Sequence, residues 1–132
     1  MSLNNPYEAY QNNAIQTASG SKLTLMLYNG CINFINRALQ ELEDRDYEAK
    51  NHSIQRAQAI VQELMITLDQ SVDIAQQMLP LYEYMNHKLQ QGNIKNDPES
   101  LKEALEIATE FRDTWQEVMK KTAKSYQTGT RV

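Results

Sequence analysis

The sequence is poor in the residues that interrupt regular structure, with only four glycines and three prolines among its 132 residues. This scarcity favours long helices over many short strands joined by turns. Its single cysteine, Cys31, cannot form an internal disulfide, so the chain fits a reducing compartment. It has no stretch of roughly 20 apolar residues, and its first residues are not a basic region followed by an apolar run. We therefore expect a cytoplasmic protein without a signal peptide or membrane insertion.

Positive charge is also in short supply. Lysine and arginine number 13 against 17 acidic residues, which gives a formal net charge of −4 and a sequence pI near 5.2. Such a balance opposes binding to the phosphate backbone of nucleic acids, so we expect no nucleic-acid partner. The length indicates one domain, which can bury a core without disulfides or metal.

Apolar residues recur at alternating spacings of three and four in four segments, as in amphipathic helices. Short polar links separate these segments, so consecutive helices are expected to run antiparallel. The sequence therefore predicts an all-α, up-down-up-down four-helix bundle over residues 19–124. It is preceded by an N-terminal arm or short cap helix at 1–18 and followed by a frayed tail at 125–132. The expected helices are about 21–43, 46–70, 74–92 and 98–122.

Local signals suggest how these helices begin and end. A side-chain oxygen of Ser19 or Ser21 can cap the first helix, and Asp46 can cap the second. Gly92-Asn93 is expected to stop the third helix, because both residues tolerate the left-handed conformation. Pro80 predicts that the third helix either begins near Leu79 or is kinked there, since proline lacks the backbone N–H.

Catalytic and metal chemistry find little support. A di-iron site needs inward glutamates and Glu-x-x-His pairs, whereas His52 and His87 have their nearest acidic residues four positions earlier. Surface pairs explain that spacing better. Cys31 lies on the apolar stripe of the first helix and is interpreted as a small buried hydrophobe. We expect no enzyme activity, no metal and no cofactor.

Two alternatives to a binding module stay open. His87 and Leu89 partly match the His-x-Leu-Lys-Gly pattern of histidine phosphotransfer bundles, but Gln90 and Gln91 replace the Lys and Gly. A bundle that associates with itself through apolar surface is the other alternative.

The chain carries more apolar surface than a simple bundle requires. Leu23 through Tyr28 is almost unbroken, and the second helix is apolar nearly all round between Ile60 and Ile66. The arm adds Tyr7 and Tyr10, three residues apart. Together these features predict an apolar groove shielded by a tyrosine-bearing arm, a groove of the kind that accepts an amphipathic helix.

Several motifs in order resemble the FliS family of flagellin-specific export chaperones. They are Asn5-Pro6-Tyr7-Glu8-Ala9-Tyr10, Leu23-Thr24-Leu25-Met26-Leu27-Tyr28-Asn29-Gly30, Ala57-Gln58-Ala59-Ile60-Val61-Gln62-Glu63-Leu64, Leu81-Tyr82-Glu83-Tyr84-Met85, Asn93-Ile94-Lys95-Asn96-Asp97 and Phe111-Arg112-Asp113-Thr114-Trp115. The resemblance covers about Pro6 through Trp115. It implies a helical bundle that binds the disordered C-terminal segment of flagellin, prevents premature polymerisation and delivers flagellin to the flagellar type III export gate. It also implies contact with the export-gate protein FlhA and, in some members, with FliW.

The resemblance also suggests the partner-binding residues. Tyr7, Tyr10 and Ile15 are expected to form a mobile cap, as the matching segment does in the family. The expected groove residues are Leu27, Ile60, Leu64, Leu68, Tyr82 and Met85.

Overall fold

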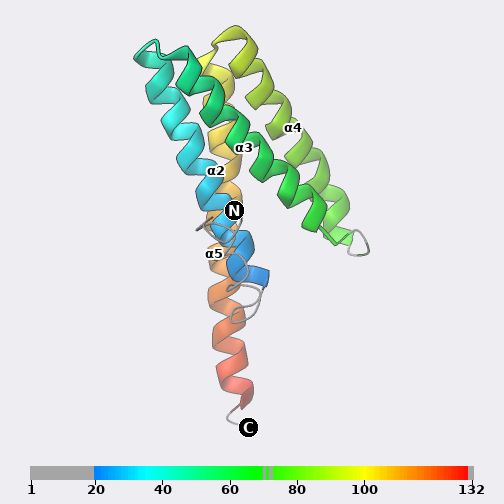
Figure 1. Cartoon of the computed structure of the whole chain (residues 1–132). Helices are drawn as coiled ribbons and strands as arrows, with labels where there is room; N and C mark the ends of the chain where they lie inside the picture. Colours follow the sequence, from blue (N-terminus) through cyan, green and yellow to red (C-terminus); the bar gives the residue numbers. More distant parts are fainter. Residues whose placement is uncertain (1–19, 70, 72, 131–132) are drawn as a thin grey trace, which may run out of the picture.

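The computed structural model describes residues 20–69, 71 and 73–130, with side chains described as far as residue 121. This part of the chain consists of α2 (Gly20–Glu43), α3 (Tyr47–Thr67), α4 (Asp73–Lys95) and α5 (Pro98–Thr130), without strands (Figure 1). The predicted all-α helical-bundle class is confirmed. The expected arm at 1–18 lies outside the described residues. No helix in the described ranges is long and apolar enough to cross a membrane.

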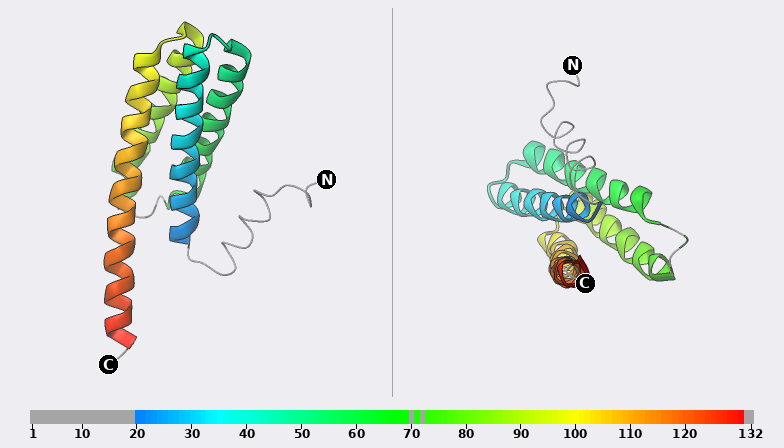
Figure 2. Two further views of the ribbon diagram at one scale, coloured as in Figure 1. Left: turned by 90° about the vertical axis from the view of Figure 1, so that its left-hand side faces the viewer. Right: turned by 90° about the horizontal axis from the view of Figure 1, so that it is seen from below.

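The helices form an antiparallel ring in chain order. Within the described ranges each helix packs against the next along the chain, and α2 also packs against α5, whereas the backbones of diagonally opposite helices stay apart. The α3–α4 hairpin leans away from α2 and α5 toward the link that joins α3 to α4 (Figure 1). The last part of α5 continues past the other helices as a single projecting helix (Figure 2). The bundle is therefore closed at one end and open at the other.

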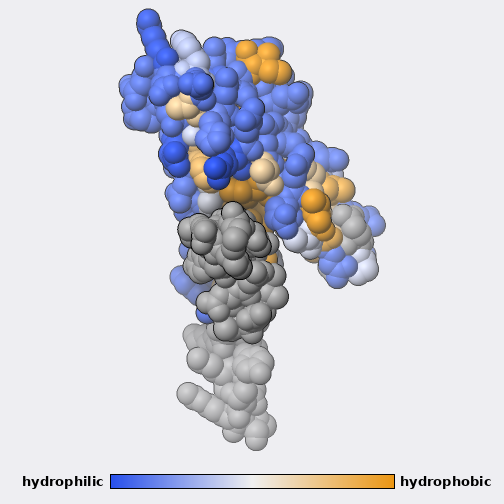
Figure 3. Space-filling view, viewed as in Figure 1, coloured by the Kyte–Doolittle hydropathy of each residue, from blue (hydrophilic) through white to orange (hydrophobic). Residues whose placement is uncertain are grey.

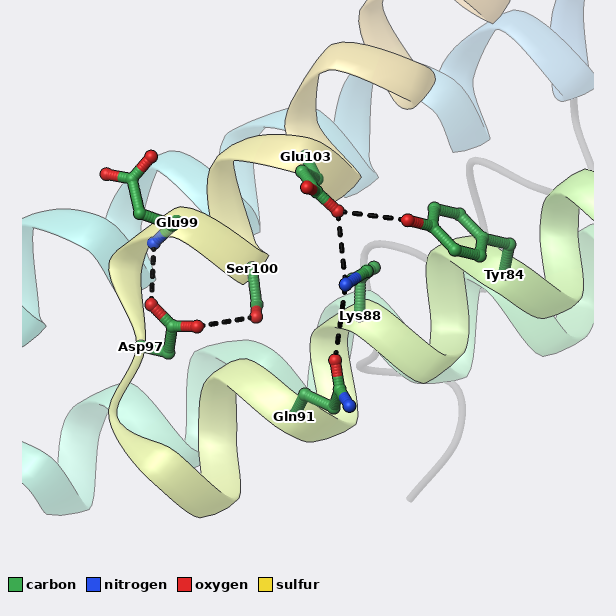
Figure 4. A network of polar contacts seen from close by, with 7 residues as sticks. All are labelled: Tyr84, Lys88, Gln91, Asp97, Glu99, Ser100 and Glu103. Atoms are coloured by element: carbon green, nitrogen blue, oxygen red, sulfur yellow. Dashed lines mark hydrogen bonds and ion pairs between the residues drawn. The ribbon is translucent and has the colours of Figure 1, made fainter.

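Two aspartates start helices at the closed end. Asp46 Oδ1 accepts a hydrogen bond from the Ala49 N–H at 3.2 Å, which confirms Asp46 as the cap of α3. Asp97 accepts from the Glu99 N–H at 3.0 Å and from Ser100 Oγ at 2.8 Å, at the start of α5 (Figure 4). Each aspartate satisfies backbone donors that the first turn of a helix leaves free.

The expectation that Gly92-Asn93 stops the third helix is wrong. α4 continues to Lys95, and the left-handed residue that follows it is Asn96, with φ 51°. Gly92 is buried inside the helix, and a Cβ there would lie 2.7 Å from Leu101 Cγ. The glycine therefore permits a close approach between α4 and α5, and Asn96 makes the turn.

Other helix ends also differ from expectation. α4 begins at Asp73 and passes through Pro80, so the proposed start near Leu79 is wrong. Pro80 lies on the exposed side of the helix. Water can therefore hydrate the carbonyl, four residues earlier, that proline cannot bond. α2 begins at Gly20, which places Ser21 inside the first turn rather than at the cap, while Ser19 lies outside the described residues. α3 ends at Thr67 rather than near residue 70. α5 extends to Thr130, whereas the frayed tail was expected from residue 125. Glycine and proline, the residues that most disfavour a helix, are absent between 117 and 128.

A polar network fixes α4 against α5 near the closed end (Figure 4). Lys88 Nζ forms an ion pair with Glu103 at 3.2 Å and donates to Gln91 Oε1 at 3.3 Å. Tyr84 donates its hydroxyl to the same Glu103 carboxylate at 3.1 Å. The network therefore holds α4 and α5 together near the closed end of the bundle.

Candidate partner-binding grooves

An apolar groove lies where the α3–α4 hairpin leans away from α2 and α5. It consists of two depressions of about 220 and 380 Å³, which adjoin because they share Tyr28, Ile74, Met78 and Trp115. We call the combined depression the open-end groove. Its remaining lining residues are Thr24, Leu64, Thr67, Leu68, Asp69, Ala75, Gln77, Leu81, Tyr82, Phe111, Thr114 and Val118.

Packed aromatic rings form the floor of the open-end groove. The Tyr28 and Phe111 rings stack with centroids 5.6 Å apart, and Tyr82 lies 5.0 Å from Phe111. The hydroxyls of Tyr28 and Tyr82 form a hydrogen bond of 2.6 Å. Burial raises the pKa of both phenols, so both stay neutral at physiological pH. This floor joins α2, α4 and α5 through ring packing and a hydrogen bond.

Trp115 forms the wall of the groove between α5 and α2. Its Nε1–H donates to the Ser21 carbonyl oxygen at 2.8 Å, and its ring meets Tyr28 edge-on at 6.4 Å. The indole is only partly buried, so one side of it stays open to the groove. Because Ser21 lies in the first turn of α2, the chain that precedes α2 joins the bundle beside this groove.

The rim of the open-end groove exposes large apolar side chains. Ile74, Leu81 and Val118 are 54%, 46% and 45% exposed, although each belongs to a helix of the bundle. In Figure 3 apolar surface gathers between α2 and α3, and again toward the free end of the α3–α4 hairpin. An apolar surface of this kind on a small protein indicates a binding site for another protein.

A second, separate groove lies between α2 and α3. It has a volume of about 330 Å³ and shares no lining residue with the open-end groove. We call it the α2–α3 groove. Its lining residues are Phe34, Arg56, Ala59, Ile60 and Glu63.

The structure distributes the predicted site residues over three environments. Leu64, Leu68 and Tyr82 line the open-end groove, and Ile60 lines the α2–α3 groove. Leu27 and Met85 instead lie in the core, with exposures of 1% and 0%, and line neither groove. Apolar spacing did not separate them from groove residues, because each apolar stripe is broad enough to supply both the core and a groove. Tyr7, Tyr10 and Ile15 lie outside the described residues.

Sequence reasoning missed most residues that α4 and α5 contribute to the open-end groove. Ile74, Met78, Phe111, Trp115 and Val118 line this groove but were not among the expected groove residues. Apolar spacing alone could not identify them, because core and groove positions share the same stripes.

The described side chains offer little for catalysis. Among them no group of three or more His, Cys, Asp or Glu residues could hold a metal ion. Burial raises the pKa of the Cys31 thiol to about 12, so it stays protonated and behaves as a small hydrophobe. His87 is exposed on α4 and lines neither groove. Both grooves are predominantly apolar, which suits recognition of an amphipathic segment better than bond chemistry.

Comparison with known proteins gives one consistent answer. A family profile described as "Flagellar protein FliS" matches residues 3–122. The flagellar secretion chaperone FliS of Bacillus subtilis is 44% identical over 124 residues, covering 94% of this chain and 93% of that protein. The Campylobacter jejuni protein of the same name is 30% identical over 120 residues, covering 89% and 94%. A solved structure described as "Crystal structure of flagellar chaperone from bacteria" superposes with a TM-score of 0.73. It has 16% identity and covers 87% of this chain and 98% of its own, so the likeness concerns the fold.

Proposed function

The chain belongs to the FliS family of flagellar secretion chaperones, and we propose that its client is the disordered C-terminal segment of flagellin. In this proposal the protein works in the cytoplasm, covers that segment so that flagellin does not polymerise early, and delivers it to the flagellar type III export gate. Contact with the gate protein FlhA, and with FliW, belongs to the same proposal. We assign no enzyme activity and no cofactor.

The open-end groove is the observation that carries this proposal. It is predominantly apolar and rimmed by Ile74, Leu81 and Val118, each of which leaves about half of its surface exposed. An amphipathic helix laid in such a groove buries its apolar face while its polar face stays in water. Binding a disordered segment buries roughly 1,000–3,000 Å² and costs about 2–5 kcal/mol in ordering, so the client can be held specifically and still be released.

We assign the arm the role of a mobile cap. Tyr7, Tyr10 and Ile15 precede α2, whose first turn lies beside the open-end groove through the Trp115–Ser21 hydrogen bond. The arm is therefore tethered next to the groove, at a high effective concentration. In this role its aromatic side chains cover the apolar rim until flagellin displaces them, with Leu64, Leu68 and Tyr82 as the groove residues beneath.

Calorimetry with a peptide from the C-terminal end of flagellin of the same organism tests the proposal. We expect binding with a clearly negative heat-capacity change, which Leu68→Ser weakens. A Tyr7→Ala/Tyr10→Ala variant binds more tightly if the arm only competes, and more weakly if it also holds the client. No heat and no co-elution would contradict flagellin as the client. Incubation with acetyl phosphate would then test phosphotransfer at His87, an alternative that the comparisons do not favour.

A further inference from the structure

A glycine lets α2 and α3 approach closely beside the α2–α3 groove. Gly30 lies one turn before Phe34 on the same face of α2. A Cβ at Gly30 would lie 3.2 Å from Ile60 Cδ1, so Ile60 of α3 packs directly against the bare backbone. Phe34 stands at one end of the groove, and Ala59 and Ile60 form its side. The groove therefore has an apolar middle, and two charged residues, Arg56 and Glu63, complete its lining.

Two arginines meet on the aromatic ring at one end of this groove. The guanidinium carbons of Arg37 and Arg56 lie 5.4 and 5.9 Å from the centroid of the Phe34 ring. The two come from different helices, and both are exposed. Contact with the ring stabilises guanidinium groups but uses none of their N–H donors. Among the described residues neither arginine has a carboxylate or carbonyl partner, so these donors are available to another molecule.

Charge is distributed unevenly along the groove. Arg56 and Glu63 are seven positions apart on α3, which places them on one face and about two helical turns from each other. The Phe34 end therefore carries two guanidinium charges, and the far end carries one carboxylate. In a chain of net charge −4, a positive end beside an apolar groove is a distinct feature. An acidic side chain is complementary to the Phe34 end alone.

From this juxtaposition we propose that the α2–α3 groove is a second docking site, which binds an acidic amphipathic helix of a partner protein. The apolar stripe of that helix lies over Ala59 and Ile60. A carboxylate at one end of the stripe accepts hydrogen bonds from Arg37 and Arg56, whose planar groups match a carboxylate in two-point geometry. The site is separate from the open-end groove, so the two can be occupied by different segments.

A synthetic helix of this chemistry provides the probe. It carries leucines at spacings of three and four, two glutamates at one end of that stripe and a side-chain staple that holds it helical; a second copy carries glutamines in place of the glutamates. Fluorescence anisotropy with the full chain measures binding. We expect the acidic peptide to bind about tenfold more tightly than the glutamine copy, and more weakly as salt rises.

Matched substitutions locate the binding. Ala59→Glu places a negative charge in the α2–α3 groove, whereas Gln77→Glu places the same charge in the open-end groove, and both positions are exposed. We expect Ala59→Glu and Arg56→Glu each to weaken binding of the acidic peptide by about tenfold, and Gln77→Glu to leave it unchanged. Unchanged far-ultraviolet circular dichroism and melting temperature show that each variant is folded.

Three outcomes would overturn the proposal. The first is equal binding of both peptides, and the second is greater sensitivity to Gln77→Glu than to Ala59→Glu. The third is occupation of the groove by the chain itself. It would be seen either as a concentration-dependent dimer that Arg56→Glu dissociates, or as binding of the acidic peptide only after residues 1–18 are removed. A separate titration with the flagellin peptide distinguishes this proposal from the proposed function. Leu68→Ser should weaken binding of the flagellin peptide and leave binding of the acidic peptide unchanged.

Discussion

The hydroxyl oxygens of Tyr28 and Tyr82 lie 2.6 Å apart, and both side chains are almost completely buried. The two residues come from α2 and α4, helices that face each other across the bundle and make no backbone-level contact within the described ranges. The hydrogen bond therefore links the two halves of the molecule directly beneath the open-end groove. Stability of the bundle and shape of the groove depend on the same pair.

Replacing both tyrosines of this pair should cost clearly less than the two single replacements added together. Tyr28→Phe or Tyr82→Phe leaves the other hydroxyl buried without its partner, so we expect the free energy of unfolding to fall by about 1–3 kcal/mol. The double variant removes both polar groups and should lose clearly less than the sum. Denaturant unfolding of the four proteins measures the coupling, and strictly additive losses would show that the hydrogen bond is unimportant.

Stability should decline at alkaline pH. Burial raises the pKa of Cys31 from 9.0 to about 12, and it also raises the pKa of Tyr28 and Tyr82. Each group holds its proton more tightly when folded, so unfolding releases protons above the ordinary pKa, and stability falls as pH rises. Below about pH 7, well under the ordinary pKa of all three groups, they contribute almost no pH dependence.

The cysteine share of this decline can be isolated. Cys31→Ala should make the fall between about pH 9 and pH 11 less steep by about 1.4 kcal/mol per pH unit, while the tyrosine share remains. Urea unfolding at a series of pH values provides the slopes. An unchanged slope would mean that the thiol titrates normally in the folded state.

The close approach at Gly92 makes a prediction about alanine. Gly92→Ala places a methyl group against Leu101 Cγ and 3.3 Å from the Asp97 carbonyl oxygen, so we expect a loss of about 1–3 kcal/mol in stability. Gly20→Ala is the matched control, because nothing lies within 4 Å of its Cβ. There the better helix propensity of alanine should leave stability unchanged or raise it by up to about 1 kcal/mol. Thermal unfolding compares the two variants, and equal effects would contradict the close contact at Gly92.

The fold was predictable because its signals are local. Apolar spacing marks each helix, the carboxylate of Asp46 marks the start of α3, and Pro98 marks the start of α5. Gly92 misled the prediction because glycine suits both a left-handed stop and a close helix contact, and only the neighbouring helix decides between them.

The site was less predictable because it depends on how the helices are placed. Leu27 and Leu68 both belong to apolar stripes, yet Leu27 faces the core and Leu68 the open-end groove. That difference arises from the lean of the α3–α4 hairpin, which apolar spacing does not encode. Trp115 and Val118 of α5 line the groove with Ile74 and Met78, which lie near the start of α4. The motif resemblance identified the family, but it could not separate core positions from groove positions.

Trp115 should report occupancy of the open-end groove. It is the single tryptophan of the chain and one side of it faces the groove, so a bound helix should shift its fluorescence emission to shorter wavelength. Val118→Ser removes an exposed apolar rim residue, and we expect it to weaken binding of the flagellin peptide by about fivefold. Ile94→Ser is the matched control, because Ile94 is 72% exposed and lines neither groove. Titration of each variant with the peptide, followed by the emission shift, compares them. If both variants weaken binding equally, the client does not occupy the open-end groove, and exposed apolar area alone accounts for its affinity.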